Sequence, residues 1–288
     1  MSAVSRREAL GLLAGAAGLF TTTAPGQAES RRESVIVPGR LKQSVCRWCY
    51  QAMPLEDLCR NAAAIGLTSV ELLDEGEWPV VRRFGLTCAM ANGPGPIEEG
   101  WNRLDLHDKL AAEAGRLLPL AAKAGLPNLI VFSGNRSGLS DADGIANCAR
   151  GLARITPLAE RVGVTLCLEL LNSKVDHHDY QCDHTAWGVE VVNRVGSPRL
   201  KLLYDIYHMQ IMDGDVIRTI RDNIQFIGHF HTGGVPGRGE IDDTQELNYR
   251  RICQAIVELG YQGYLGQEFV PTRDPMTSLR QGVEICSV

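Results

Sequence analysis

Lys201-Leu-Leu-Tyr-Asp-Ile-Tyr-His-Met-Gln210 is an apolar run that stops at an acid, Asp205, with a histidine, His208, three residues further on. A strand that is covered on both faces has a continuous apolar sequence instead of an alternating one. We therefore predict a buried strand that ends at Asp205. Ionisable side chains at the end of such a strand indicate a functional site, and here we predict a metal site.

Three other segments have the same form. The runs at 164–169, 225–231 and 263–268 are strand-like, and each ends in an acid or a histidine. An interval of 26 to 37 residues, as found between these ends, holds about one strand and one helix. The four polar strand ends, in chain order, are Glu169, Asp205, His231 and Glu268.

The same alternation extends over residues 41–288, and no change in composition marks an internal boundary. The pattern predicts one (β/α)8 TIM barrel, whose usual size of about 250 residues fits this length. Active sites of such barrels lie at the C-terminal ends of the strands, where the four polar side chains fall. Including the segments above, we predict strands at 41–48, 68–73, 86–90, 128–132, 164–169, 201–205, 225–231 and 263–268.

Three carboxylates and one imidazole at one barrel mouth would be unfavourable without a cation. We therefore predict that Glu169, Asp205, His231 and Glu268 bind one divalent metal ion. Oxygen ligands with one histidine suit Mn²⁺, Mg²⁺ or Co²⁺, and the set is also compatible with Zn²⁺. The alternative is that each acid pairs with an arginine or caps a helix.

A metal ion in this position can bind the carbonyl oxygen and the neighbouring hydroxyl oxygen of an α-hydroxycarbonyl compound. Glu169 and Glu268 come from strands on opposite sides of the mouth, so they can act as acid and base on two carbons or on two faces of one carbon. The predicted reaction class is isomerisation or epimerisation through an enediolate.

Two further residues are candidates for substrate binding. His208 follows the strand end, where its ring could form a hydrogen bond with a substrate oxygen. The alternative is a structural role, which is more common for a lone histidine. Arg238 lies on the glycine-rich loop 235–240 and could bind a carboxylate through two parallel hydrogen bonds. The alternative for Arg238 is an arginine on a flexible surface loop.

The N-terminal 28 residues differ from the rest of the chain. Arg6 and Arg7 precede an apolar stretch of about 12 residues and then small residues up to Ala28. We predict a twin-arginine (Tat) signal peptide at 1–28, a polar segment at 29–40, and export to the periplasm. The apolar stretch is too short for a stable membrane span. If the signal is not used, the protein stays in the cytoplasm.

Composition indicates a globular protein that acts on a small molecule. Of the 288 residues, 44% are hydrophobic and 22% are charged, and the formal net charge is −5. The basic residues are scattered along the sequence, so we predict no nucleic-acid partner. Assembly into a homo-oligomer is left open.

The nine cysteines include Cys46 and Cys49, which have C-x-x-C spacing. One such pair is weak support for a redox or metal half-site, and no second C-x-x-C follows to complete a Zn(Cys)4 site. We predict buried free thiols. A disulfide involving Cys46 or Cys49 is the alternative in an oxidising compartment.

These motifs resemble the hydroxypyruvate isomerase family, within the xylose-isomerase-like TIM barrels that also include the ketose 3-epimerases. The resemblance implies metal ligands at Glu169, Asp205, His231 and Glu268, an acid/base pair of Glu169 and Glu268, and substrate contacts from His208 and Arg238. The matching stretches are 169–172, 195–210, 213–215, 227–229, 235–240, 247–249 and 258–263.

One departure bears on the substrate. The hydroxypyruvate isomerases have glutamine at the position of His231, whereas the sugar epimerases have histidine. The first hypothesis is a metal-dependent isomerase that interconverts hydroxypyruvate and tartronate semialdehyde. The alternatives are a ketose 3-epimerase or keto-inositol epimerase on the same site, and an exported sugar-binding barrel without turnover. A related endonuclease would need more histidines and a basic face.

Overall fold

The structure is a computed structural model, and it describes residues 39–288. The predicted signal peptide at 1–28 and nearly all of the polar segment at 29–40 lie outside these residues, so both stay predictions. Within 39–288, no helix is both long enough and apolar enough to cross a membrane.

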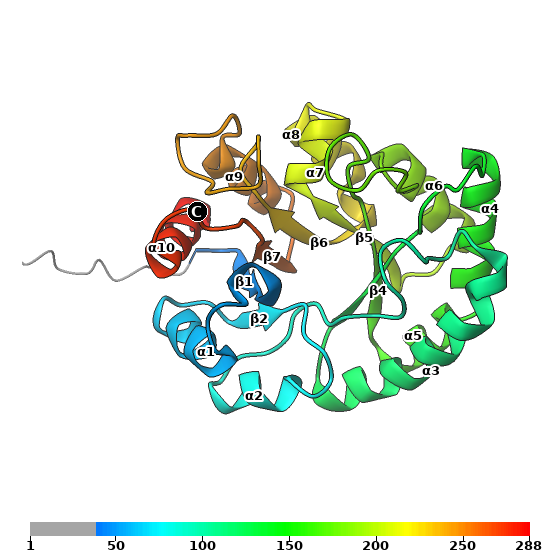
Figure 1. Cartoon of the computed structure of the whole chain (residues 1–288), viewed down its shortest axis with the longest axis horizontal. Helices are drawn as coiled ribbons and strands as arrows, with labels where there is room; N and C mark the ends of the chain where they lie inside the picture. The colour runs from blue at the N-terminus through cyan, green and yellow to red at the C-terminus, as the bar shows by residue number, and fades with distance from the viewer. Residues whose placement is uncertain (1–38) are drawn as a thin grey trace, which may run out of the picture. The chain divides into compact units, whose positions relative to one another are not determined.

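Seven parallel strands form one curled sheet (Figure 1). Their order is β2-β1-β7-β6-β5-β4-β3, so strands that are neighbours in the sheet are also neighbours in sequence, except for β1 and β7, and the two edge strands are β2 and β3. All pairings are parallel, and the C-terminal ends therefore meet at one mouth. The strands are β1 Lys42–Cys46, β2 Ser69–Glu71, β3 Asn128–Val131, β4 Thr165–Glu169, β5 Leu200–Asp205, β6 Ile227–Thr232 and β7 Tyr264–Gln267.

The predicted strand at 86–90 does not form a regular strand, but its chain segment fills the eighth position of the barrel. Isolated parallel bridges join Thr87 to Ser69 of β2, and Ala91, directly after the segment, to Leu73 on one side and to Leu129 of β3 on the other. Its ladder is interrupted at Ala89, whose N–H donates to Ser69 Oγ (2.8 Å) and whose carbonyl accepts from Asn128 Nδ2 (2.8 Å). Because side chains satisfy these backbone groups, the barrel closes without a continuous eighth strand.

Helices surround the sheet, as Figure 1 shows. Their apolar faces cover the outside of the strands and form the main core. The helices are α1 Leu55–Ala64, α2 Trp78–Arg83, α3 His107–Ala124, α4 Asp141–Leu152, α5 Thr156–Val162, α6 Thr185–Val195, α7 Ile206–Met212, α8 Val216–Asn223, α9 Tyr249–Glu258 and α10 Pro275–Cys286.

The chain between β3 and β4 forms two helices, α4 and α5, and a proline lies in the first turn of α5. Proline lacks an N–H, which favours a helix start and disfavours a helix interior. A further helix, α7, begins directly after β5.

The inside of the barrel is divided into an apolar half and a polar half. Met90, Ile130, Cys167 and Leu203 form a separate apolar cluster within the ring. Strands β1, β2, β6 and β7 instead carry buried polar side chains, which include two histidines and one glutamate. The polar half leads up to the mouth, so the fold places ionisable groups below the predicted site.

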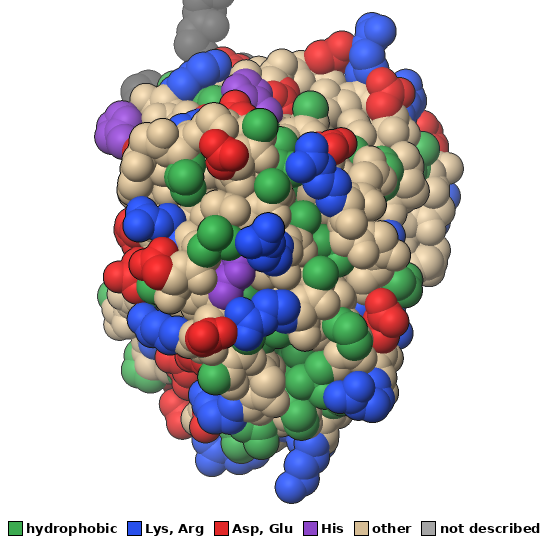
Figure 2. Space-filling view, turned by 90° about the vertical axis from the view of Figure 1, so that its right-hand side faces the viewer, with side chains coloured by type: hydrophobic (Ala, Val, Ile, Leu, Met, Phe, Trp, Pro, Cys, Tyr) green, Lys and Arg blue, Asp and Glu red, His purple; other side chains and the backbone are tan. Residues whose placement is uncertain are grey.

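The outer surface carries charges of both signs. On the face drawn in Figure 2, lysine and arginine side chains are interspersed with aspartate and glutamate. Exposed arginines such as Arg60 and Arg194 pair with acids on the same helix. These pairs contribute little to stability, because solvent screens them.

Candidate metal centre and active site

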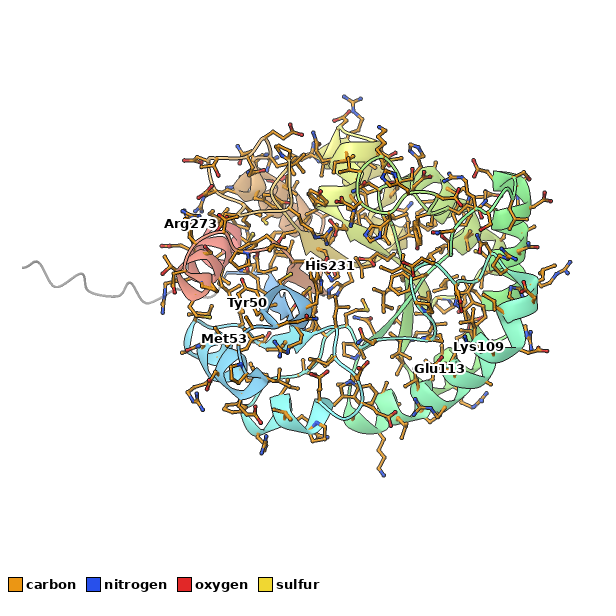
Figure 3. All side chains as sticks on the ribbon, in the orientation of Figure 1. Tyr50, Met53, Lys109, Glu113, His231 and Arg273 are labelled. Atoms are coloured by element: carbon orange, nitrogen blue, oxygen red, sulfur yellow. The ribbon has the colours of Figure 1, made fainter. Side chains whose placement is uncertain are left out.

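A cavity of about 830 Å³ opens at the mouth of the barrel. Its lining includes Glu169, His208, Arg238 and Glu268, together with Trp48 from the short helix after β1. Figure 3 places His231 near the centre of the ring, whereas Arg273 lies on the outside. The cavity size is within the range of small-molecule sites.

The structure brings all four predicted metal ligands together. Glu169, Asp205, His231 and Glu268 each contribute a ligand atom, and these atoms all lie within 4.8 Å of one another. The four side chains are buried. Glu169 and Asp205 end β4 and β5, His231 is the penultimate residue of β6, and Glu268 directly follows β7.

The imidazole of His231 supports a cation at the centre of this cluster. Its Nδ1 atom lies 2.7 Å from Glu268 Oε2 and 3.3 Å from Glu169 Oε1, yet it makes no hydrogen bond of acceptable geometry within the described residues. A buried polar atom without a partner is costly. One nitrogen and three carboxylates facing a common point are the donors that a divalent cation accepts, so the residues fit a metal ion.

Burial and mutual charge shift the pKa values of this cluster in different directions. Burial raises the pKa of Glu169 to about 7 and that of Asp205 to about 6. Burial also acts on Glu268, but His231 and Arg238 outweigh it and hold the pKa of Glu268 well below its usual value. For His231, the carboxylates outweigh burial and raise the pKa. Two carboxylates with opposite shifts are suited to acid and base roles.

Arg238 is largely buried and points into the site, so it is not a surface arginine. Its Nη2 lies 2.8 Å from Asp205 Oδ2 and 2.5 Å from Glu268 Oε2. Its guanidinium also lies over the rings of Tyr207 and Trp48, at 4.9 and 5.5 Å. Arg238 therefore neutralises two of the predicted ligands. Because its side chain also lines the cavity, its guanidinium can contact an anionic group of a substrate there.

His208 also lines the cavity, on the first turn of α7. The helix begins here because Asp205 caps it, accepting the His208 backbone N–H at Oδ1 (3.2 Å). The ring is held from two sides, since the Asn172 backbone N–H donates to Nδ1 (3.1 Å) and Arg238 Nη1 lies 2.6 Å from Nε2. Burial lowers the pKa of His208, so the ring is neutral near pH 7.

The sequence predictions did not assign a role to Trp48, Glu71 or His229. Trp48 Nε1 donates to Glu268 Oε1 (2.6 Å), and Glu71 lies below the predicted metal ligands with His229. Two signals were present in the sequence. Glu71 is an acid between Val70 and Leu72 in the predicted strand 68–73, and His229 is two residues from His231, which places both on one face of β6.

All nine cysteines are unpaired, in agreement with the prediction of free thiols. Eight of them are buried, including Cys46, and Cys49 is partly exposed. Burial raises the pKa of the Cys46 thiol well above its usual value, so this thiol is not an activated nucleophile.

Comparison with protein families gives a match over residues 59–286 to the xylose isomerase-like TIM barrel model. The chain is similar to a 2-oxo-tetronate isomerase from Cupriavidus necator, with 33% identity over 77% of this chain and 89% of that protein. It is also similar to the hydroxypyruvate isomerase of Escherichia coli (34% identity, 38% of this chain) and to a human protein named putative hydroxypyruvate isomerase. The chain spans only 44% and 40% of the lengths of these last two relatives.

Two solved structures share the fold. An AP endonuclease of family 2 from Brucella melitensis superposes with a TM-score of 0.75 at 24% identity, covering 83% of this chain and 97% of that one. A 3-keto-D-glucoside 4-epimerase from E. coli superposes with a TM-score of 0.70 at 20% identity, covering 84% and 97%. At these identities the likeness extends to the architecture alone. The eight-membered parallel barrel and the match over 59–286 show that the chain belongs to the xylose isomerase-like TIM barrel family.

Proposed function

We propose that this protein is a metal-dependent isomerase of a small 2-oxo acid that carries a hydroxyl group on the neighbouring carbon. The observation that carries the proposal is the convergence of Glu169, Asp205, His231 and Glu268. Two of them, Glu169 and Glu268, line the cavity of about 830 Å³. The relatives named hydroxypyruvate isomerase and 2-oxo-tetronate isomerase support the same reaction class.

The metal ligands in this proposal are Glu169, Asp205, His231 and Glu268, and the ion is Mn²⁺, Mg²⁺ or Co²⁺, with Zn²⁺ also compatible. When bound, the ion supplies charge stabilisation for the oxygen atoms of the substrate. Arg238 and His208 line the cavity beside the cluster and bind the substrate carboxylate and hydroxyl oxygens.

Glu268 is the base in the proposed reaction, because Arg238 and Trp48 stabilise its ionised form. It takes the proton from C3 of the substrate, and the electron pair of that C–H bond moves into a C2–C3 double bond. Glu169 delivers a proton to C2, and proton exchange with water then returns both glutamates to their starting states. The hydroxyl proton moves from the oxygen on C3 to the oxygen on C2. The carbonyl group has then moved by one carbon, and the atoms balance.

Hydroxypyruvate, with tartronate semialdehyde as product, is the first candidate substrate. A four-carbon 2-oxo-tetronate is the second, because the relative of that name matches over 89% of its own length. The cavity volume also leaves room for a ligand longer than three carbons. Ketoses and keto-inositols are the alternatives within the same chemistry.

The test is to incubate Mn²⁺-loaded protein in D₂O with each acid and follow the C3 protons by NMR, with and without a chelator. Chelator-sensitive deuterium incorporation with appearance of the isomer is the expected result. The variants Glu169→Gln and Glu268→Gln should lose exchange, whereas Arg60→Gln, on the outer helix α1, should retain it. Exchange with a ketose alone would move the function to epimerisation. No exchange with any of these compounds would contradict the proposal and favour a sugar-binding barrel.

A further inference from the structure

Directly below the predicted metal ligands, one buried carboxylate oxygen accepts hydrogen bonds from three side chains. Glu71 Oε1 lies 3.0 Å from His229 Nε2, 3.0 Å from His231 Nε2 and 3.5 Å from Cys46 Sγ. None of these four residues is exposed to solvent. The group comes from three strands, β1, β2 and β6, so only the closed barrel brings it together.

This contact determines which nitrogen of His231 faces the metal site. A neutral imidazole has one N–H and one lone pair. Because the Glu71 carboxylate can only accept, it holds the hydrogen of His231 on Nε2. The lone pair is then on Nδ1, the atom that lies 2.7 Å from Glu268 Oε2 and 3.3 Å from Glu169 Oε1. A carboxylate behind a histidine ligand orients the ring and increases its basicity.

The neighbouring strand leaves space for this pair. Gly266 lies on β7, beside His231 in the register of the sheet. A Cβ atom at this position would overlap Glu71 Oε1 and would lie 2.8 Å from His231 Cδ2. The absence of a side chain at Gly266 therefore allows the carboxylate to reach the histidine.

Within residues 39–288, no lysine or arginine neutralises the buried carboxylate of Glu71. Its second oxygen, Oε2, and His229 Nδ1 have no hydrogen-bond partner within residues 39–288, and neither lysine nor arginine pairs with Glu71 there. A buried carboxylate without such a partner is expensive to maintain, which favours a role in the site above it.

We propose that Glu71 is a positioning residue that fixes the tautomer and orientation of His231 and thereby sets the affinity of the site for its metal ion. His229 contacts the same oxygen and helps to hold the carboxylate in place. The inference rests on the metal dependence in the proposed function, but not on the identity of the substrate.

The experiment measures Mn²⁺ binding to the metal-free full chain by calorimetry, without substrate. Glu71→Leu removes the acceptor, and we expect it to weaken Mn²⁺ binding roughly 10- to 100-fold. Glu71→Gln keeps an acceptor oxygen of the same reach, and we expect it to restore most of the affinity. Ser44→Ala is the matched control, since Ser44 is a buried residue of β1 whose hydroxyl has no partner within the described chain.

Circular dichroism would establish that each variant is folded, and Glu71→Met, which also lacks the carboxylate acceptor, replaces Glu71→Leu if that variant does not fold. Equal Mn²⁺ affinity in Glu71→Leu and the parent would overturn the proposal, as would equal loss in Glu71→Leu and Glu71→Gln. Two Mn²⁺ ions per chain, reduced to one by Glu71→Gln, would make Glu71 a ligand and also overturn it. If Mn²⁺ binding follows the expected series while no substrate is isomerised, the proposed function fails and this inference stands.

Discussion

Trp48 Nε1 donates a hydrogen bond of 2.6 Å to Glu268 Oε1, and this contact joins the chain after β1 to the end of the neighbouring strand, β7. The bond stabilises the ionised carboxylate, because an N–H is pointed at a negative charge. It leaves Glu268 Oε2 directed at His231 and Arg238. The first prediction concerns the loss of this bond.

Trp48→Phe keeps an aromatic ring and removes the N–H. A hydrogen bond to a charged group contributes about 1.5–3 kcal/mol, so we expect kcat/KM to fall roughly 10- to 100-fold. The pKa of Glu268 should rise. The acidic side of the pH–activity profile should therefore shift to higher pH than in the parent. Trp78→Phe is the control, because Trp78 Nε1 donates to a backbone carbonyl outside the cavity lining. An unchanged acidic limb in Trp48→Phe would show that the bond does not tune Glu268.

Metal affinity should increase as the pH rises from about 5 to 8. In the metal-free protein, the pKa values of Glu169, Asp205 and His231 are all raised, so these groups hold protons near neutral pH. Ligands must lose those protons before they bind a cation. Calorimetry in buffers with different ionisation enthalpies should detect proton release on Mn²⁺ binding. Affinity that does not change with pH would contradict this assignment of protons.

Metal-free protein should become less stable between pH 6.5 and 8. A group whose pKa is raised by folding binds more protons in the folded state, so the free energy of unfolding falls as the pH rises through the raised value. Glu169, with a pKa of about 7, and His231, with a raised pKa, both act in this window. Thermal unfolding followed by circular dichroism with excess chelator should give a lower Tm at pH 8, and Mn²⁺ should reverse the trend. A higher Tm at pH 8 under chelation would disagree with it.

Arg238→Met should destabilise the metal-free protein. The substitution leaves Asp205 and Glu268 buried without their arginine, and removal of one partner from a buried ion pair costs about 3–5 kcal/mol. Because Mn²⁺ would neutralise the same carboxylates, the loss should be smaller when the metal is present. Urea unfolding with and without Mn²⁺ measures both values. Arg194→Met, which removes an exposed pair on α6, is the control and should have little effect.

The twin arginines should determine the location of the protein. Lys in place of both Arg6 and Arg7 keeps the charge of the N-terminus but removes the recognition motif. We expect the parent in the periplasmic fraction, shortened by about 28 residues, and the variant in the cytoplasm at full length. Mass spectrometry of both fractions measures this. A parent protein that stays in the cytoplasm at full length would rule out export.

The sequence by itself determined the barrel and the convergence of four side chains. Residues in a buried parallel strand must be apolar, so a polar residue at the end of such a run is visible without any structure. Since all strands of a parallel barrel end at the same mouth, Glu169, Asp205, His231 and Glu268 had to meet once the spacing of β-α units was recognised.

Only the tertiary structure decided what surrounds those four residues. Trp48 and Glu268 are 220 positions apart, and Glu71 and His231 are 160 apart, so no local pattern relates them. The sequence left a surface position open for Arg238 as an alternative to the site, and its ion pairs with Asp205 and Glu268 place it in the site. Hydrogen bonds and ion pairs depend on distance and direction within a few tenths of an ångström, and barrel closure supplies that geometry. Periodicity in the sequence records which face a residue occupies, but not which side chain it meets there.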